Sequence, residues 1–193
     1  MRVIAGKYRS RPLRSLRGLD IRPTSDRLRE TLFNILTAGN PSVLEGTVWL
    51  DLFAGTGAVG IEALSRGARE VVFVESSADA AALIRNNLKS LHIESGFRVL
   101  LDHLPRSLRR LECAAADVVF LDPPYRMTDA YGETLRELAE SPAVGAFPIV
   151  IAEHEKRFDP GEEFGNLRRF RKLVQGSAAL SFYRKVGAGG SEE

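Results

Sequence analysis

The segment Asp122-Pro123-Pro124-Tyr125 carries the side chains best suited to chemistry in this sequence. Two prolines fix the backbone, so the Asp122 carboxylate and the Pro123 carbonyl could each accept one N–H of a nucleobase amine. The nitrogen would then turn its lone pair towards a methyl sulfonium, while Tyr125 stacks on the flat base. The segment predicts methyl transfer to an exocyclic amine, with the released proton passing to Asp122 or water. An ordinary strand-ending turn is the alternative.

A glycine-rich segment further upstream predicts a nucleotide-binding turn. Gly55, Gly57 and Gly60 follow the G-x-G-x-x-G pattern between a predicted strand and a predicted helix, and Glu75 lies 20 residues after the first glycine. Such glycines allow a tight turn and close helix packing, and the acid can accept ribose hydroxyls. Asp51 would repel a dinucleotide pyrophosphate but attract the ammonium of S-adenosylmethionine, which is therefore the predicted cofactor.

These residues need a parallel sheet to position them. Short apolar runs alternate with helical stretches, which is typical of strands covered on both faces. The predicted strands are 47–52, 70–75, 97–101, 117–121 and 147–152. The predicted helices are 58–66, 77–91, 103–113 and 128–140, with Ser76 or Ser77 as the N-cap of the second. Asp102 follows the third strand, where it could contact an adenine amino group or cap the next helix.

The two ends of the chain differ from this alternating pattern. Segments 167–174 and 178–185 flank a Gly turn and predict an antiparallel hairpin, so the fold class is α/β with a mixed sheet of about seven strands. Leu28, Leu32, Ile35 and Leu36 form an apolar stripe on a helix that Thr24 or Ser25 could cap. We expect an arm and helix over 1–40, a core over 41–186 and a disordered tail over 187–193.

Composition restricts the class of protein. The 193 residues contain one cysteine, too few for an internal disulfide or a cysteine-based metal site, and scattered histidines predict no metal. Neither a signal peptide nor a membrane span is evident, so a cytoplasmic protein is expected. Residues 1–36 hold nine Lys or Arg and three acids, whereas the remainder is net acidic. A basic arm on an acidic body is typical of polyanion binding, although a solvated tail is an alternative.

The motifs together resemble class I S-adenosylmethionine-dependent methyltransferases with a Rossmann-like fold. More specifically, the arm, the R-P-T-x-D-R-x-R-E-x-L-F segment from Arg22 to Phe33 and the glycine turn resemble the bacterial 16S ribosomal RNA guanine-N2 methyltransferase family, RsmD, over residues 2 to about 186. The resemblance implies methylation of one guanine N2 in 16S rRNA, guanine 966 in the family's usual numbering, within an assembled or partly assembled small subunit. A monomer is the expected state.

The resemblance also implies roles for particular residues. Asp122, Pro123, Pro124 and Tyr125 would hold the amine, and Thr24 would help to close over the cofactor and base. The implied cofactor residues are Thr24, Asp51, Phe53, Ala54, Gly55, Thr56, Gly57, Glu75, Ser76, Asp102, His103 and Asp122. The implied RNA-binding residues are Lys7, Arg9, Arg11, Arg22 and Arg27. Two residues depart from the family pattern: Ser10 replaces a frequent glycine, and His103 is bulkier than expected.

Other functions share parts of this pattern. An adenine-N6 DNA methyltransferase or a protein-glutamine methyltransferase uses the same Pro-Pro-Tyr chemistry, but it usually carries an added recognition domain. A nicotinamide-dependent oxidoreductase would use the glycine turn and Glu75, although Asp51 and the proline loop argue against it. An RNA-binding assembly factor with a vestigial pocket is the fourth possibility.

Overall fold

The computed structural model describes residues 1–15, 25–111 and 114–186. The chain forms two compact units, Met1–His103 and Leu104–Glu193. The predicted disordered tail and Thr24 lie outside the described residues, as does Arg22. The division between an arm with its helix and a core at residue 40 stays a prediction.

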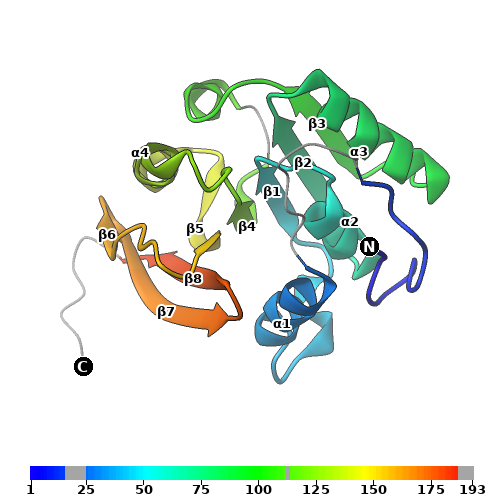
Figure 1. Cartoon of the computed structure of the whole chain (residues 1–193), viewed down its shortest axis with the longest axis horizontal. Coiled ribbons are helices and arrows are strands. Elements are labelled where there is room, and N and C mark those ends of the chain that lie inside the picture. The colour runs from blue at the N-terminus through cyan, green and yellow to red at the C-terminus, as the bar shows by residue number, and fades with distance from the viewer. Residues whose placement is uncertain (16–24, 112–113, 187–193) are drawn as a thin grey trace. The chain divides into compact units, whose positions relative to one another are not determined.

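The first unit is built on three parallel strands in the order β3-β2-β1. Leu50 pairs with Val72, and Phe73 pairs with Val99, so the carboxyl ends of the three strands lie at one edge. Figure 1 shows α2 and α3 lying along these strands, which they contact. The elements are α1 (Asp26–Leu36), the 3-10 helix η1 (Pro41–Leu44), β1 (Val48–Leu52), α2 (Ala58–Ser65), β2 (Glu70–Glu75), α3 (Ala78–Ser90) and β3 (Phe97–Leu101).

Local sequence explains where the helices of this unit begin. The hydroxyl of Ser25 accepts a hydrogen bond from the Leu28 amide at 3.2 Å, and that of Ser77 accepts one from Ala80 at 3.3 Å. Both serines satisfy an amide that a helix start leaves unpaired. One of the two predicted N-cap candidates is thus confirmed for each helix.

The second unit holds five strands in the order β4-β5-β8-β7-β6. Strand β5 runs parallel to β4 and antiparallel to β8, so the sheet is mixed, as predicted. The antiparallel hairpin is confirmed, with Gln175 paired to Ala178 across the turn. The elements are the 3-10 helix η2 (Arg106–Arg110), β4 (Ala116–Leu121), α4 (Thr128–Glu140), β5 (Val144–Glu155), β6 (Glu163–Phe164), β7 (Leu167–Gln175) and β8 (Ala178–Lys185).

Three predictions about elements need correction. The described residues form eight strands instead of about seven, because the two-residue β6 pairs with β7. The α-helix predicted over 103–113 is wrong over its described part, residues 103–111, which contains only a 3-10 helix from Arg106 to Arg110. Pro105 disfavours helical backbone in the residue before it, which the apolar pattern did not reveal. Strand β5 begins at Val144, ahead of the predicted 147, and Phe147 is 95% exposed beside a register shift with β4.

Candidate active site

The glycine-rich turn connects β1 to α2 in the first unit. Gly57 is the N-cap of α2 with a φ of 74°, in the left-handed region that favours glycine. A Cβ on Gly60 would lie 2.3 Å from Cε1 of Phe73, so this glycine lets α2 pack closely on β2. The predicted turn and packing roles of the glycines are thus confirmed at these two positions.

Asp51 lies at the end of β1, under the turn. Its carboxylate is buried, and its Oδ2 accepts a hydrogen bond from the Gly60 amide at 2.9 Å. Burial raises the pKa of Asp51 to about 7; the hydrogen bond from Gly60 opposes this, and the charge of Glu75 adds to it. A buried carboxyl that titrates near neutrality gains its charge more readily when a cation approaches. Asp51 therefore combines a structural bond to α2 with chemistry suited to a cationic ligand.

Glu75 joins two loops through its carboxylate. One oxygen accepts the Gly55 amide at 2.8 Å, and the other accepts the Ser77 amide at 2.8 Å. A carboxylate offers about four acceptor positions, so two remain for hydroxyl groups. The Glu75 backbone carbonyl also accepts the Asp102 amide at 3.0 Å. Asp51, Gly55, Glu75 and Asp102 are thereby brought together at the carboxyl edge of β1, β2 and β3.

The remaining predicted cofactor residues of this unit lie in the same loops. Phe53 has a φ of 58°, an uncommon conformation for a non-glycine residue, and Ala54 donates its amide to Val74 at 3.1 Å. Thr56 is buried, whereas Ser76 and His103 are exposed. Asp102 accepts the His103 amide at 2.7 Å. Because the next helix is η2 and its N-cap is Pro105, the helix-cap alternative for Asp102 is wrong.

The Asp122-Pro123-Pro124-Tyr125 loop follows β4 in the second unit. Pro123 is buried and Pro124 exposed, while Asp122 and Tyr125 are half-buried. These four residues and the glycine turn belong to different units, and their meeting around one ligand stays a prediction.

Tyr131 of α4 places its hydroxyl beside the Pro123 carbonyl, which the sequence predicts to accept an amine N–H. Its hydroxyl lies 3.2 Å from the Pro123 carbonyl oxygen and 2.9 Å from that of Glu153. Burial raises the pKa of Tyr131, with a further contribution from the charge of Asp122, so the hydroxyl keeps its proton. Sequence reasoning missed this residue; the signal was a tyrosine on the apolar face of a helix, whose buried hydroxyl needs a partner.

The N-terminal arm, defined here as residues 1–14, is an ordered hairpin. Val3 donates its amide to Arg11 at 2.9 Å, and Ser10 donates to Val3 at 2.8 Å. Ser10 has a φ of 67°, so the serine adopts the backbone conformation that a glycine would favour. The turn that the family pattern implies therefore forms despite the departure at this position.

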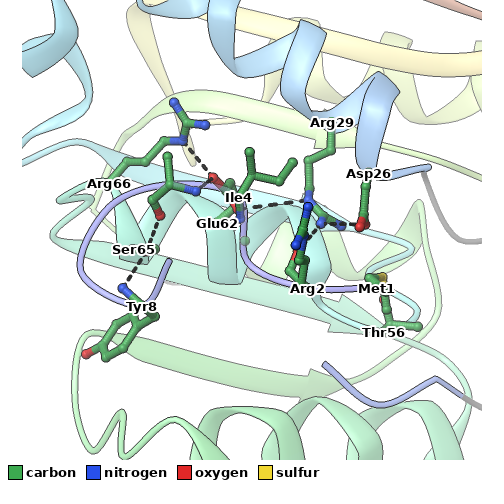
Figure 2. Close-up of polar contacts among 12 residues, drawn as sticks. Met1, Arg2, Ile4, Tyr8, Asp26, Arg29, Thr56, Glu62, Ser65 and Arg66 are labelled. Atoms are coloured by element: carbon green, nitrogen blue, oxygen red, sulfur yellow. Dashed lines mark hydrogen bonds and ion pairs between the residues drawn. The ribbon is translucent and has the colours of Figure 1, made fainter. Parts of the chain in front are cut away.

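The arm is anchored on α2, mainly through Glu62 (Figure 2). The two Glu62 carboxylate oxygens accept the Ile4 amide at 2.7 Å and the Ala5 amide at 3.0 Å, and Arg66 donates to the same group at 2.8 Å. A Cβ on Gly6 would lie 1.8 Å from the Ser65 carbonyl oxygen, so the backbones approach closely there. The backbone of the arm is therefore a built part of the first unit, and polyanion binding by its side chains stays a prediction.

Two buried polar side chains extend this anchor. Arg29 of α1 donates to the Arg2 carbonyl and to Asp26, and it lies 4.0 Å from the Glu62 carboxylate (Figure 2). Asn87 of α3 accepts the Arg14 amide at 2.9 Å and donates to the Thr56 carbonyl at 3.1 Å. Asn87 therefore links the end of the arm directly to the glycine-rich turn, a connection with no sequence signal.

The anchoring leaves the cationic side chains of the arm exposed. Lys7, Arg9 and Arg11 project from the hairpin, and Arg27 is exposed on α1. Their backbone is held while their charged ends meet solvent, an arrangement suited to phosphate groups.

Neither a metal site nor a membrane span is found among the described residues. Within the described ranges, no group of three or more His, Cys, Asp or Glu side chains is placed to hold a metal ion. None of the helices in the described part of the chain combines the length and apolar character needed to cross a membrane.

The fold is the Rossmann-like class I methyltransferase fold. The Escherichia coli protein named "Putative methyltransferase yhhF" matches with a TM-score of 0.80 and 32% identity, covering 96% of this chain and 97% of that one. A hypothetical protein from Thermus thermophilus, TTHA0928, matches with a TM-score of 0.74 and 30% identity, covering 94% and 98%.

Residues 1–184 match the family described as Conserved hypothetical protein 95, and the chain belongs to that family. Ribosomal RNA small subunit methyltransferase D of Escherichia coli K12 is 30% identical over 192 residues, covering 100% of this chain and 93% of that protein. The protein of the same name from Haemophilus influenzae is 35% identical over 161 residues, covering 81% and 79%. The resemblance predicted from the motifs is confirmed.

Proposed function

We propose that this protein transfers a methyl group from S-adenosylmethionine to the exocyclic N2 amine of one guanine in 16S rRNA. The observation that carries the proposal is the loop after β4, in which Asp122 is followed by the Pro123 carbonyl, whose oxygen lies 3.2 Å from the Tyr131 hydroxyl. Family membership and relatives named as small-subunit rRNA methyltransferases support it. Guanine 966 of a partly or fully assembled small subunit is the proposed target.

The residues at the carboxyl edge of β1 to β3 fit such a cofactor. Glu75 keeps two acceptor positions for ribose hydroxyls, and the buried Asp51 suits an ammonium group. When bound, the cofactor supplies an electrophilic methyl group on sulfur. The putative methyltransferase SMU.776, whose structure contains SAH, shares this fold with a TM-score of 0.63 at 15% identity. This similarity is consistent with a ligand of the same type.

Asp122 and the Pro123 carbonyl would then prepare the amine. A carbonyl oxygen accepts two hydrogen bonds, so Pro123 can accept an amine N–H beside the Tyr131 hydroxyl. Accepting both N–H groups withdraws the nitrogen lone pair from the ring and directs it at the methyl carbon. As the amine receives the methyl group, Asp122 or water would take the proton that the nitrogen loses. Tyr125 would stack on the base.

The arm would provide the nucleic-acid contact. Lys7, Arg9 and Arg11 form an exposed basic group on a backbone fixed by Glu62. Phosphate contacts from such side chains position RNA, whereas the amine-binding loop selects the base. Arg27 would add to this surface.

Radiolabelled methyl transfer to undermethylated small subunits tests the proposal, with nucleoside analysis of the extracted RNA. We expect N2-methylguanosine at one site, and near-complete loss of transfer for Asp122→Asn with cofactor affinity retained. Asp129→Asn is the matched control because that exposed carboxylate lies in the first turn of α4. Label in adenosine or protein would overturn the substrate, and unchanged turnover for Asp122→Asn would overturn its role. Binding of NADH would favour an oxidoreductase.

A further inference from the structure

The β7–β8 hairpin presents two different faces. Across the paired strands, Arg169 lies opposite Tyr183 and Lys172 opposite Ser181, which places these cations on one face. Arg171 lies opposite Phe182, and Arg184 is two residues further along β8, so both are on the other face.

On the first face the cations are neutralised by acids. Arg169 pairs with Asp159 at 2.6 Å and with Glu162 at 2.9 Å, and Lys172 pairs with Asp159 at 2.8 Å. These ion pairs hold the loop between β5 and β6, and the paired cations have little charge left for a ligand.

The second face carries an exposed aromatic ring and two cations. Phe170 lies where the β7–β8 register shifts, and 47% of it is exposed. The guanidinium carbon of Arg184 lies 5.7 Å from its ring centroid, and the Phe182 ring lies 6.2 Å away. We define the hairpin patch as Phe170, Arg171 and Arg184.

The two cations of the hairpin patch, Arg171 and Arg184, are not neutralised by acids of residues 114–186. Arg168, next to Arg184 across the strands, is neutralised by Glu163 of β6. Within residues 114–186, no acid forms an ion pair with Arg171 or Arg184. An exposed ring and two unneutralised arginines on one face of the hairpin offer a base a stacking surface and offer two phosphates a cation each.

We propose that the hairpin patch binds a single-stranded segment of the RNA substrate, with a base on Phe170 and flanking phosphates on Arg171 and Arg184. This contact is additional to the arm and rests on the proposed function for the identity of its ligand. The charge favours a polyanion, and the accessible ring favours unpaired nucleotides over a duplex, whose bases are already stacked.

The test measures binding of the full chain to a short fluorescein-labelled single-stranded RNA by anisotropy, across a range of KCl concentrations and without methyl donor. Arg171→Ala with Arg184→Ala is expected to reduce the slope of log affinity against log salt by about 1.4, or about 0.7 for each phosphate that is no longer neutralised. Phe170→Leu keeps an apolar side chain against Phe182 and removes the stacking surface. It is expected to weaken binding about 5-fold or more at fixed salt without changing the slope.

The matched control is Lys89→Ala with Arg157→Ala, which removes two exposed cations from elsewhere on the chain. A slope that falls equally in this control would overturn the proposal, because net charge alone would explain it. An unchanged slope for the arginine variant, or unchanged affinity for Phe170→Leu, would also overturn it. Methyl transfer is measured separately. A wild-type protein that binds RNA but transfers no methyl group refutes the proposed function alone. Normal transfer, with an unchanged salt slope for the arginine variant, refutes the hairpin contact alone.

Discussion

Replacing Glu62 with Gln tests whether one carboxylate holds the N-terminal arm. The two Glu62 oxygens accept two backbone amides and the Arg66 guanidinium, all from within a buried site. Gln keeps the shape but turns one acceptor into an NH2 donor, which then faces another donor. It also removes the negative charge that compensates the buried Arg29. Hydrogen bonds to a charged group contribute about 1.5–3 kcal/mol each, and breaking a buried pair costs about 3–5 kcal/mol.

We therefore expect Glu62→Gln to lower the free energy of unfolding by about 3 kcal/mol, measured by urea denaturation. Hydrogen exchange should accelerate at the Ile4 and Ala5 amides, because they lose their acceptor. Glu94→Gln serves as the control, since that carboxylate is exposed in the same unit. A loss below about 0.5 kcal/mol, together with unchanged exchange at both amides, would refute the reasoning.

Four further substitutions probe the glycine-rich turn, the arm and the loop from Asp122 to Tyr125. Gly60→Ala should destabilise the fold by about 2 kcal/mol or more, because its Cβ would overlap the Phe73 ring; an unchanged thermal midpoint would contradict this. Ser10→Gly should stabilise the arm by about 0.5–1 kcal/mol by relieving its positive φ, seen as slower exchange in residues 1–14. The pKa of Asp51 is raised to about 7, so ionisation destabilises the folded state and stability falls as pH rises from about 4 towards 7; Asp51→Asn should abolish that fall in pH-dependent denaturation. Tyr131→Phe should lower kcat several-fold while leaving cofactor affinity unchanged, and the reverse pattern would exclude a role in the loop.

The parts of the fold that depend on neighbours in sequence were accessible to prediction. The Gly55-Gly57-Gly60 spacing encodes a turn and a close packing contact, and both are local to one strand-helix unit. The N-caps at Ser25 and Ser77 are equally local, because a cap bonds an amide three residues ahead.

Contacts between residues that are far apart in the sequence could not be predicted from it. In the sequence, Glu62 looks like an ordinary acid on the surface of a helix. Only the folded structure shows that it accepts two amides from the arm, 57 and 58 residues away. The Tyr131 hydroxyl likewise lies within hydrogen-bond distance of two carbonyls, one of them 22 residues away in the chain. The wrong helix over 103–113 had a local cause, since apolar spacing outweighed the effect of Pro105 on the preceding backbone.

The Glu75 carboxylate accepts hydrogen bonds from the Gly55 and Ser77 amides, and these bonds affect how tightly a ligand can bind. Its bonds immobilise two loops before any ligand arrives, so their conformational entropy is lost during folding instead of during binding. Ordering a backbone residue costs about 1–2 kcal/mol, and a pocket that begins ordered spares the ligand that loss. By ordering the two loops before the ligand binds, Glu75 therefore increases binding affinity, whether or not it touches the ligand itself.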